Sequence, residues 1–340
     1  MSRGATVLPA ALVAVAVGAV LGAAVVEVGR VEVALAGRRR ATVDALHAVD
    51  GCVAETLAAV TPAWDLSALL VGPDGVVGTP DDGQIALPAG CTGRAGPPPG
   101  AAGPPRALVT VEARTRRARR SVDALVGLAV APGVPALLWL TGSTASETIA
   151  GTMSLDGADA GAPPSHWAAL AAPDEPETLD AWLALESGHV TVAANTVPPL
   201  VAAPPPLAVL AARVRAASPA GPEVLVPSAP AVALAYVAGD LTIVDRRQGA
   251  GLLFVDGALD IHAPFDFTGL VVASRGIRIA SGASCTVSGA LWVGVPTPFA
   301  PSLLVDGGLA LRRDPTALGV ADGLAPLPRR AVLLGIRDLG

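Results

Sequence analysis

The chain has 340 residues, of which 38 are glycine and 32 are proline, about a fifth of the total. That share is below the roughly 25–30% that indicates wholesale disorder, so most of the chain is expected to fold. Hydrophobic residues make up 52% but aromatic residues only 3%, which argues against a large aromatic-lined ligand site. The net charge of −6 excludes a global attraction to nucleic acid, because such binding requires a surplus of basic residues.

The N-terminal segment contains an apolar run from Val7 to Val26 without a charged residue. Twenty helical residues rising about 1.5 Å each match the roughly 30 Å hydrocarbon layer of a bilayer, so the run predicts a membrane-spanning helix. The alternative is a cleaved signal peptide, whose apolar core typically has only about 7–15 residues. Four small residues would let a second helix approach this one closely in lipid: Gly18, Ala19, Gly22 and Ala23.

The same helix is expected to continue past the apolar run, because charged residues follow it without a Gly-Pro break. Apolar side chains recur at spacings of three, four and their sums, the stripe typical of an amphipathic helix: Val28, Val31, Leu35, Leu46, Val49, Val53 and Leu57. Thr61-Pro62 should end it, since the residue before proline disfavours the α conformation. Residues 1–61 are therefore predicted to form one long helix, half in lipid and half packed against a soluble domain.

The arginines that flank the span bear on its orientation. Arg3 precedes it, whereas Arg30 and Arg38 to Arg40 follow it. The positive-inside rule would then place the C-terminal side in the cytoplasm. Arg38 to Arg40 lie twelve or more residues beyond the span, where a packed amphipathic helix can carry them.

The order of these features resembles a known family. Arg3-Gly4, the long apolar span, the charged helix and the segment Ala48-Val49-Asp50-Gly51 are similar to the N-terminal domain of PilX-like pilus-assembly proteins, minor-pilin-like components of the type IV pilus machinery. The resemblance implies a bacterial inner-membrane protein with a short cytoplasmic N-terminus, one span and a periplasmic or cell-surface domain. It also implies other pilin-like or pilus-assembly proteins and inner-membrane lipid as partners.

The sequence departs from ordinary type IV prepilins at one position. Cleavage after Gly4 would place Pro9 where those proteins carry a glutamate, at the fifth mature position. This departure argues against processing by a prepilin peptidase and against regular incorporation into a filament.

The middle of the chain is punctuated by Pro/Gly/Ala-rich stretches at 93–105, 197–207 and 216–230. Residues 62–106 are expected to form a loop-rich linker region, and residues 107–230 a mixed α/β pilin-like region. Within the latter, Ala107–Val111 indicates a strand and His166–Leu185 a helix. The segment Glu112–Arg120 packs five arginines into nine residues, which favours an exposed charged strand or helix over a phosphate site, because no aromatic residue interleaves.

Asp74, Asp81 and Asp82 lie among glycines and prolines, where their carboxylates could serve a calcium ion. Calcium takes about six to eight oxygens and the spacing is not that of an EF-hand, so a plain Asp/Gly turn is favoured. No other cofactor is expected.

The three cysteines are Cys52, Cys91 and Cys285. If the soluble part is exported, Cys52 and Cys91 are the natural disulfide pair and Cys285 is left over. In a reducing compartment all three would be small buried apolar groups.

Residues 231–313 carry an internal repeat. Glycines recur at intervals of 18 or 19 residues in three series: Gly239, Gly257 and Gly276; Gly289 and Gly308; Gly251 and Gly269. Short alternating strands closed by glycine turns at such a period favour a parallel β-solenoid, and an ordinary antiparallel sheet is the alternative. The glycines expected at the solenoid turns are Gly239, Gly257, Gly269, Gly276, Gly289 and Gly308. Residues 314–340 are expected to form a cap or tail over the last coil.

This repeat also resembles the C-terminal module of large PilX-like proteins. Phe267-Thr268-Gly269-Leu270-Val271 matches the Phe-x-Gly-Leu-Val strand of that module. The two resemblances cover opposite ends of the chain.

The sequence contains no P-loop, GxGxxG after a strand, HExxH or GxSxG motif. His262 lies near Asp260 and Asp266, but alternation places Asp260 and His262 on the solvated face of a repeat strand, so no catalytic residue and no small-molecule substrate are predicted. The expected fold is α+β and membrane-anchored, and the leading function is that of a non-enzymatic structural component of a type IV pilus or related envelope assembly. The alternatives are a surface module that binds polysaccharide or protein, and a bactofilin-like scaffold that polymerises through the solenoid.

Overall fold

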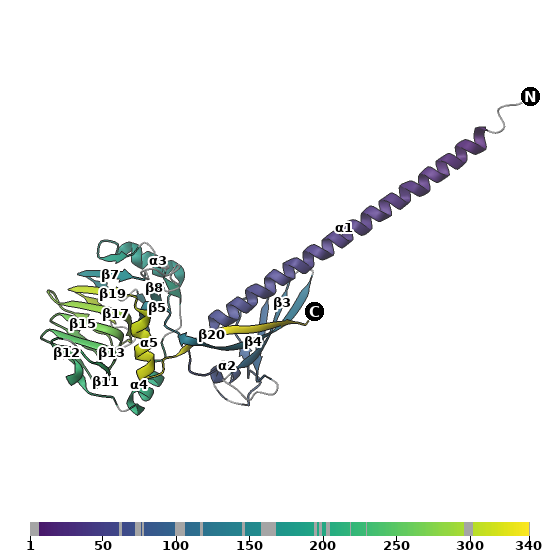
Figure 1. The fold of residues 1–340 in the computed structure, drawn as a ribbon. Coiled ribbons are helices and arrows are strands. Elements are labelled where there is room, and N and C mark those ends of the chain that lie inside the picture. The colour runs from purple at the N-terminus through teal and green to yellow at the C-terminus, as the bar shows by residue number, and fades with distance from the viewer. Residues whose placement is uncertain are drawn as a thin grey trace, which may run out of the picture. The chain divides into compact units, whose positions relative to one another are not determined.

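The structure is a computed structural model of an α+β fold whose sheets are mostly parallel, and its contacts divide the chain into two compact units (Figure 1). The first unit comprises residues up to Ala59, Ser67–Val126 and Leu333–Gly340, and the second Val60–Leu66 and Gly127–Val332. The structure describes residues 7–60, 63–71, 76, 78–98, 106–115, 118–144, 147–157, 168–193, 196, 199–201, 205–217, 219–228, 230–295 and 302–339.

Helix α1 (Val7–Ala59) forms the N-terminal part of the first unit and has 53 residues. Its end at Ala59 agrees with the stop predicted from Thr61-Pro62. The buried side chains lie on one stripe near its C-terminal end: Ala45, Val49, Cys52, Val53 and Thr56. The predicted amphipathic stripe is wrong in its first half, because Val28, Val31 and Leu35 are exposed and only residues from Ala45 onward pack against the sheet.

The sheet of the first unit has the order β1-β2-β3-β4-β20. Its strands are β1 (Gln84–Ile85), β2 (Cys91–Gly96), β3 (Ala107–Arg114), β4 (Arg119–Pro132) and β20 (Arg329–Asp338). Neighbouring strands from β1 to β4 pair antiparallel. Strand β3 alternates strictly, so Ala107, Val109, Val111 and Ala113 are buried on the face that carries α1.

Short helix α2 (Ser67–Val71) contacts β1 and β2. The loop-rich linker expected at 62–106 therefore contains a helix and two strands of this sheet. Proline and glycine are frequent in the sequence there, and the strands form because β2 pairs with β3 and β1 pairs with β2.

The second unit is built on two mainly parallel sheets. The larger sheet has the strand order β10-β8-β5-β17-β15-β13-β11, with β19, β7 and β9 beside it, and the smaller has the order β12-β14-β16-β18-β6. The strands of the larger sheet are β10 (Leu200–Val201), β8 (Ala168–Ala172), β5 (Ala136–Leu140), β17 (Ser284–Val293), β15 (Phe265–Ala273), β13 (Arg247–Asp256), β11 (Val232–Ala238), β19 (Gly308–Arg312), β7 (Thr152–Asp156) and β9 (Val190–Val192). Those of the smaller sheet are β12 (Leu241–Ile243), β14 (Leu259–Ile261), β16 (Ile277–Ile279), β18 (Leu303–Val305) and β6 (Thr148–Ile149).

From β11 to β19 the chain alternates between the two sheets, and each strand pairs in parallel with the strand one repeat later. One apolar column of the smaller sheet contains Leu241, Leu259, Ile277 and Leu303 in register. The sequence repeat thus corresponds to parallel stacking, and the antiparallel alternative is wrong for these strands.

The glycines of the repeat occupy two kinds of position. Gly239, Gly257 and Gly276 lie in turns between strands, as predicted. Gly269 and Gly289 lie inside β15 and β17, however, and Gly308 begins β19, so their prediction as turn residues is wrong.

The interior glycines form a column in which Gly251, Gly269 and Gly289 are in register, with φ of +105°, +134° and +144°. A Cβ at Gly269 would lie 1.9 Å from the carbonyl oxygen of Gly251. The column therefore needs glycine both for its positive φ and for the close approach of the neighbouring backbone.

Two hydrophobic cores line the two faces of the larger sheet. One lies between the sheets and includes Leu253, Ile261 and Val271. The other lies on the opposite face, where Phe254 and Trp292 pack with side chains of α4 (Leu207–Ala216) and α5 (Pro315–Leu324). Helix α5 contacts β13, β15 and β17 on the face of the sheet, so it does not cap the last coil as expected for residues 314–340.

The parallel stack also extends beyond the predicted repeat. Strands β5, β6 and β7 pair in parallel with β17, β18 and β19, although they lie about 150 residues earlier in the chain. The boundary expected at residue 230 is therefore not a boundary of this unit. The helix predicted at His166–Leu185 is only partly present, because β8 occupies 168–172 and α3 begins at Pro176.

Candidate functional site

The candidate functional site is the N-terminal part of α1 together with its attachment to the sheet. Within residues 12–44, every side chain that the structure describes is exposed except Gly29 and Ala41, which are half-buried. The exposed residues include large apolar ones, among them Val13, Val17 and Leu21 at 62%, 52% and 61%. A helix that is apolar around its whole circumference is normally buried, and a large exposed apolar surface marks a site of interaction with protein or membrane.

The side chains of residues 7–11 and 14, part of the apolar run, lie outside the described part of the structure. Over the residues that are described, none of the helices combines the length and apolarity needed to cross a bilayer.

The four small residues predicted to pack against another helix lie on the exposed part of α1. Gly18 and Gly22 are one helical turn apart, and no atom lies within 4 Å of a Cβ placed on either. Ala19 and Ala23 follow them at the same spacing. The arrangement leaves a flat strip on which a second helix could lie closely.

The first charged residues after the apolar run pair with one another. The guanidinium of Arg30 lies 3.8 Å from the carboxylate of Glu27, and both side chains are exposed. An exposed pair three residues apart contributes only about 0.2–0.5 kcal/mol to the helix.

A disulfide joins α1 to the sheet. Cys52, which is 3% exposed, is bonded to Cys91 at the start of β2, with 5.7 Å between the two Cα atoms. This is the pair favoured in the sequence for an exported domain. Cys285 is a free, fully buried thiol, and burial raises its pKa to about 12. Such a thiol is inert as a nucleophile.

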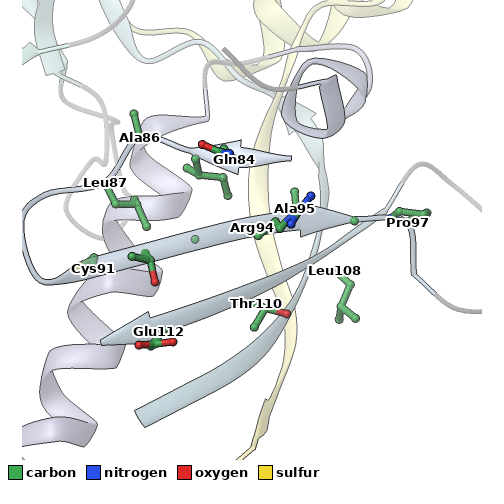
Figure 2. A pocket seen from close by; sticks show the side chains of 14 residues that line it. Gln84, Ala86, Leu87, Cys91, Arg94, Ala95, Pro97, Leu108, Thr110 and Glu112 are labelled. Carbon is green, nitrogen blue, oxygen red and sulfur yellow. The ribbon is translucent and has the colours of Figure 1, made fainter. Parts of the chain in front are cut away.

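A groove of about 940 Å³ runs over the small residues of β2 on the sheet of the first unit (Figure 2). Arg94, Thr110 and Glu112 line it together with apolar residues of the β1 segment such as Leu87. None of the described residues that line the groove is aromatic.

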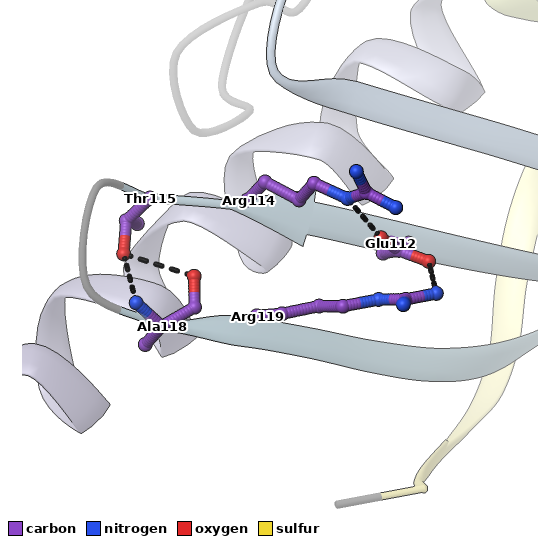
Figure 3. Close-up of polar contacts among 5 residues, drawn as sticks. All are labelled: Glu112, Arg114, Thr115, Ala118 and Arg119. Atoms are coloured by element: carbon purple, nitrogen blue, oxygen red, sulfur yellow. Dashed lines mark hydrogen bonds and ion pairs between the residues drawn. The ribbon is translucent and has the colours of Figure 1, made fainter.

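The arginine-rich segment forms the hairpin between β3 and β4 (Figure 3). The Glu112 carboxylate accepts hydrogen bonds from Arg114, at 2.6 Å, and from Arg119, and these bonds hold its pKa below the ordinary value. Arg120 pairs with Asp338 of β20. The arginines that the structure describes here are thus engaged in ion pairs, as expected for a charged strand, while Arg116 and Arg117 lie outside the described residues.

The predicted calcium ligands do not come together in the described residues. Asp74 lies outside them. The Asp82 carboxylate accepts hydrogen bonds from the Gly78 backbone N–H, at 2.8 Å, and from the Thr79 hydroxyl, while the Asp81 carbonyl accepts from Gln84. These bonds belong to a turn. Across the described residues no three His, Cys, Asp or Glu side chains are grouped to hold a metal.

The histidine considered as an acid/base group lies on the outer side of the second unit. His262 is exposed, and Asp266 pairs with Arg246 at 3.5 Å. Asp260 is half-buried on the same side of the strand. The three side chains are not joined by any hydrogen bond among those the structure describes.

A buried carboxylate was missed by sequence reasoning. Glu147 is 7% exposed and accepts hydrogen bonds from the Ser302 hydroxyl and the backbone N–H groups of Ser302 and Leu303. Burial raises its pKa above the ordinary value of 4.5. The carboxylate accepts the backbone N–H groups at the start of β18, so its role is structural. Nothing in the surrounding sequence indicated a buried acid.

No protein family, no curated protein and no solved structure matches the chain.

Proposed function

We propose that the chain is a non-enzymatic structural component of a bacterial type IV pilus or a related envelope assembly, held in the inner membrane by the N-terminal part of α1. The observation that carries the proposal is the division of α1. Its first part is apolar and exposed, while its last fifteen or so residues pack on an antiparallel sheet and are bonded to that sheet through Cys52 and Cys91. A continuous helix of this kind couples an apolar anchor rigidly to a folded domain.

Three further features support the proposal. The uncharged run from Val7 to Val26 has the length of a membrane span. The disulfide suits an oxidising compartment outside the cytoplasm, which agrees with the orientation implied by the PilX-like resemblance and opposes the arginine count. The strip around Gly18 and Gly22 suits lateral contact with other pilin-like helices in lipid.

We further propose that the parallel stack of the second unit is a β-solenoid that acts through its surface. Its support is the in-register pairing of strands one repeat apart and the alternation of the chain between two sheets. Helices α4 and α5 cover one face of the larger sheet, so contacts with partners would use the remaining surfaces.

Membrane fractionation tests the anchor. The full chain should stay with carbonate-washed membranes, and a Val17→Asp/Leu21→Asp variant should leave them, because each aspartate near the centre of a span costs about 2.5–3.5 kcal/mol. Val130→Asp is the matched control, since Val130 is 95% exposed on β4 and outside α1. Recovery of the unmodified chain in the wash would overturn the anchor.

The pilus role has its own test. Deletion of the gene in its source bacterium should reduce pilus assembly or twitching, and the intact gene should restore them. An alkaline phosphatase fused after Gly340 should be active if the domain is exported. A strain with normal pili would refute this role. An inactive phosphatase fusion, together with fluorescence from a fused reporter that folds only in the cytoplasm, would also refute it and favour a cytoplasmic scaffold.

A further inference from the structure

Strand β20 (Arg329–Asp338) is the terminal strand of the first unit's sheet. It lies beside β4, and in the described part of the chain no further strand of the sheet pairs with it, although Arg329 at its start exchanges backbone hydrogen bonds with Ala63 (Figure 1). The backbone N–H and C=O groups along that side can pair with a further strand. At ten residues, β20 is also longer than the mean strand of about five to six.

Exposed apolar side chains gather at the C-terminal end of β20 and at Leu339, the residue that follows the strand. Leu333, Leu334, Ile336 and Leu339 are 42%, 49%, 51% and 47% exposed. Successive residues of a strand point to opposite faces, so these side chains leave apolar surface on both faces of the sheet edge. By contrast, the inward residues of β3 are at most 1% exposed.

The charges that usually protect such an edge are engaged within the sheet. Arg337 lies 2.6 Å from the carboxylate of Asp123, and Asp338 pairs with Arg120, both partners belonging to β4. Natural edge strands avoid pairing by presenting unpaired charge. The two charges at the C-terminal end of β20 are thus each paired with a residue of its neighbour, while Arg329 at the other end pairs with Asp322.

We infer that β20 is an interface for a second copy of this chain, paired antiparallel about a two-fold axis through Gly335. An axis at that residue places Leu334 opposite Ile336 of the second copy, and Ile336 opposite its Leu334. Arg337 then faces Leu333 of the second copy, so no like charges are opposed. An axis at Arg337 would instead oppose two guanidinium groups, which destabilises pairing.

The self-complementary pattern is what selects a second copy as the occupant. Both apolar pairs lie on one face of the combined sheet, and Gly335 lies at the axis between them. The inference does not depend on the proposed pilus role, because it uses only the strand and its neighbour.

Cross-linking of the full chain in detergent tests the interface. Directly opposed residues in antiparallel strands have Cα atoms about 4.5–5.5 Å apart, a distance that a disulfide spans. Gly335→Cys is suitable because no atom lies within 4 Å of the added Cβ. The native cysteines will not interfere, since Cys52 and Cys91 are bonded and Cys285 is buried.

Mild oxidation should convert the Gly335→Cys protein to a covalent dimer, whereas Thr92→Cys, at an exposed position of β2, should give only background. Association through α1 alone would not distinguish the two variants. A dimer yield for Gly335→Cys no higher than for Thr92→Cys would overturn the inference.

A matched pair of charge variants in the Gly335→Cys background tests the register. Leu334→Lys/Ile336→Lys opposes like charges twice across the axis, and should lower the dimer yield about tenfold. Leu334→Lys/Ile336→Glu removes the same apolar surface but opposes opposite charges, and should retain most of the yield. Equal yields from these two variants would overturn the two-fold register, and circular dichroism of each excludes simple unfolding.

Discussion

Replacing Gly269 by alanine should destabilise the second unit strongly. The added Cβ would lie 1.9 Å from the Gly251 carbonyl oxygen, whereas an ordinary C···O contact is about 3.3–3.6 Å, so β13 and β15 would have to separate. Strain at a φ of +134° costs about 1–3 kcal/mol and overpacking about 1–3 kcal/mol more. The expected loss is about 2–6 kcal/mol, which lowers the Tm of a unit of this size by roughly 5–20 °C.

Tryptophan fluorescence reports this loss selectively, because all five tryptophans fall within the residues of the second unit. Gly282→Ala is the matched control, since Gly282 has a φ of +79° but open space around its Cβ, so only conformational strain of about 1–2 kcal/mol is expected. Gly319→Ala, in helix α5 with open space, should raise the Tm slightly. A Gly269→Ala melt that coincides with that of Gly282→Ala would refute the close stacking of the glycine column.

Three further predictions concern the core contacts and the buried acid. Cys52→Ser should destabilise the first unit by roughly 4 kcal/mol, because the bond closes a sequence separation of 39 residues, and reduction of the unmodified chain should reproduce that loss in calorimetry. Val49→Ala should cost about 2 kcal/mol because Val49 is fully buried against the sheet, while Val43→Ala, at 51% exposure, should cost little by the same measurement. Burial raises the pKa of Glu147, so the stability it contributes is fully present below pH 4.5 and is lost as pH rises through the raised pKa. The Tm of the unmodified chain minus that of Glu147→Gln should therefore fall from acid toward neutral pH, and a rise in this signed difference would contradict the assignment.

The sequence predicted the elements that local patterns specify. The end of α1 followed from one proline, and the parallel stacking of β11 to β19 followed from glycines repeated at 18 or 19 residues. The repeat placed residues in register without revealing their roles. From the repeat, Gly269 appeared equivalent to a turn glycine. In the structure it lies inside β15, next to the carbonyl oxygen of Gly251 on the adjacent strand.

The elements that were missed depend on partners distant in sequence. Strand β8 is buried on both faces, which removes the alternation that identifies a strand and leaves an Ala/Leu run that suggests a helix. Strand β5 joins β17 across about 150 residues without sharing the repeat. The residues of β20 were predicted to belong to a cap or tail, because their pairing with β4, about 200 residues earlier, produces no pattern in the local sequence.

The candidate site was predicted in part. The apolar run was evident from residue type, and the Cys52–Cys91 pair was the one predicted if the soluble part is exported. The point at which α1 begins to pack was not, since apolar residues continue evenly through Val28, Val31 and Leu35. Only the position of the sheet distinguishes those exposed valines from the buried Val49.

The order of the two units along the chain bears on how such a protein can vary. Apart from Val60–Leu66, the chain leaves the first unit within β4 and returns to it within β20, and these two strands are neighbours in one sheet. Residues 127–332, most of the second unit, therefore lie between two adjacent strands of the first sheet, so a change in the number of their parallel strands would not alter the pairing that holds α1. On the proposed function, the first unit alone holds the anchor and its disulfide, while the parallel strands of the second unit provide surface for contacts. The same topology makes β20 the last strand to join the first sheet, and its free edge is the place where that sheet can grow by adding a second copy.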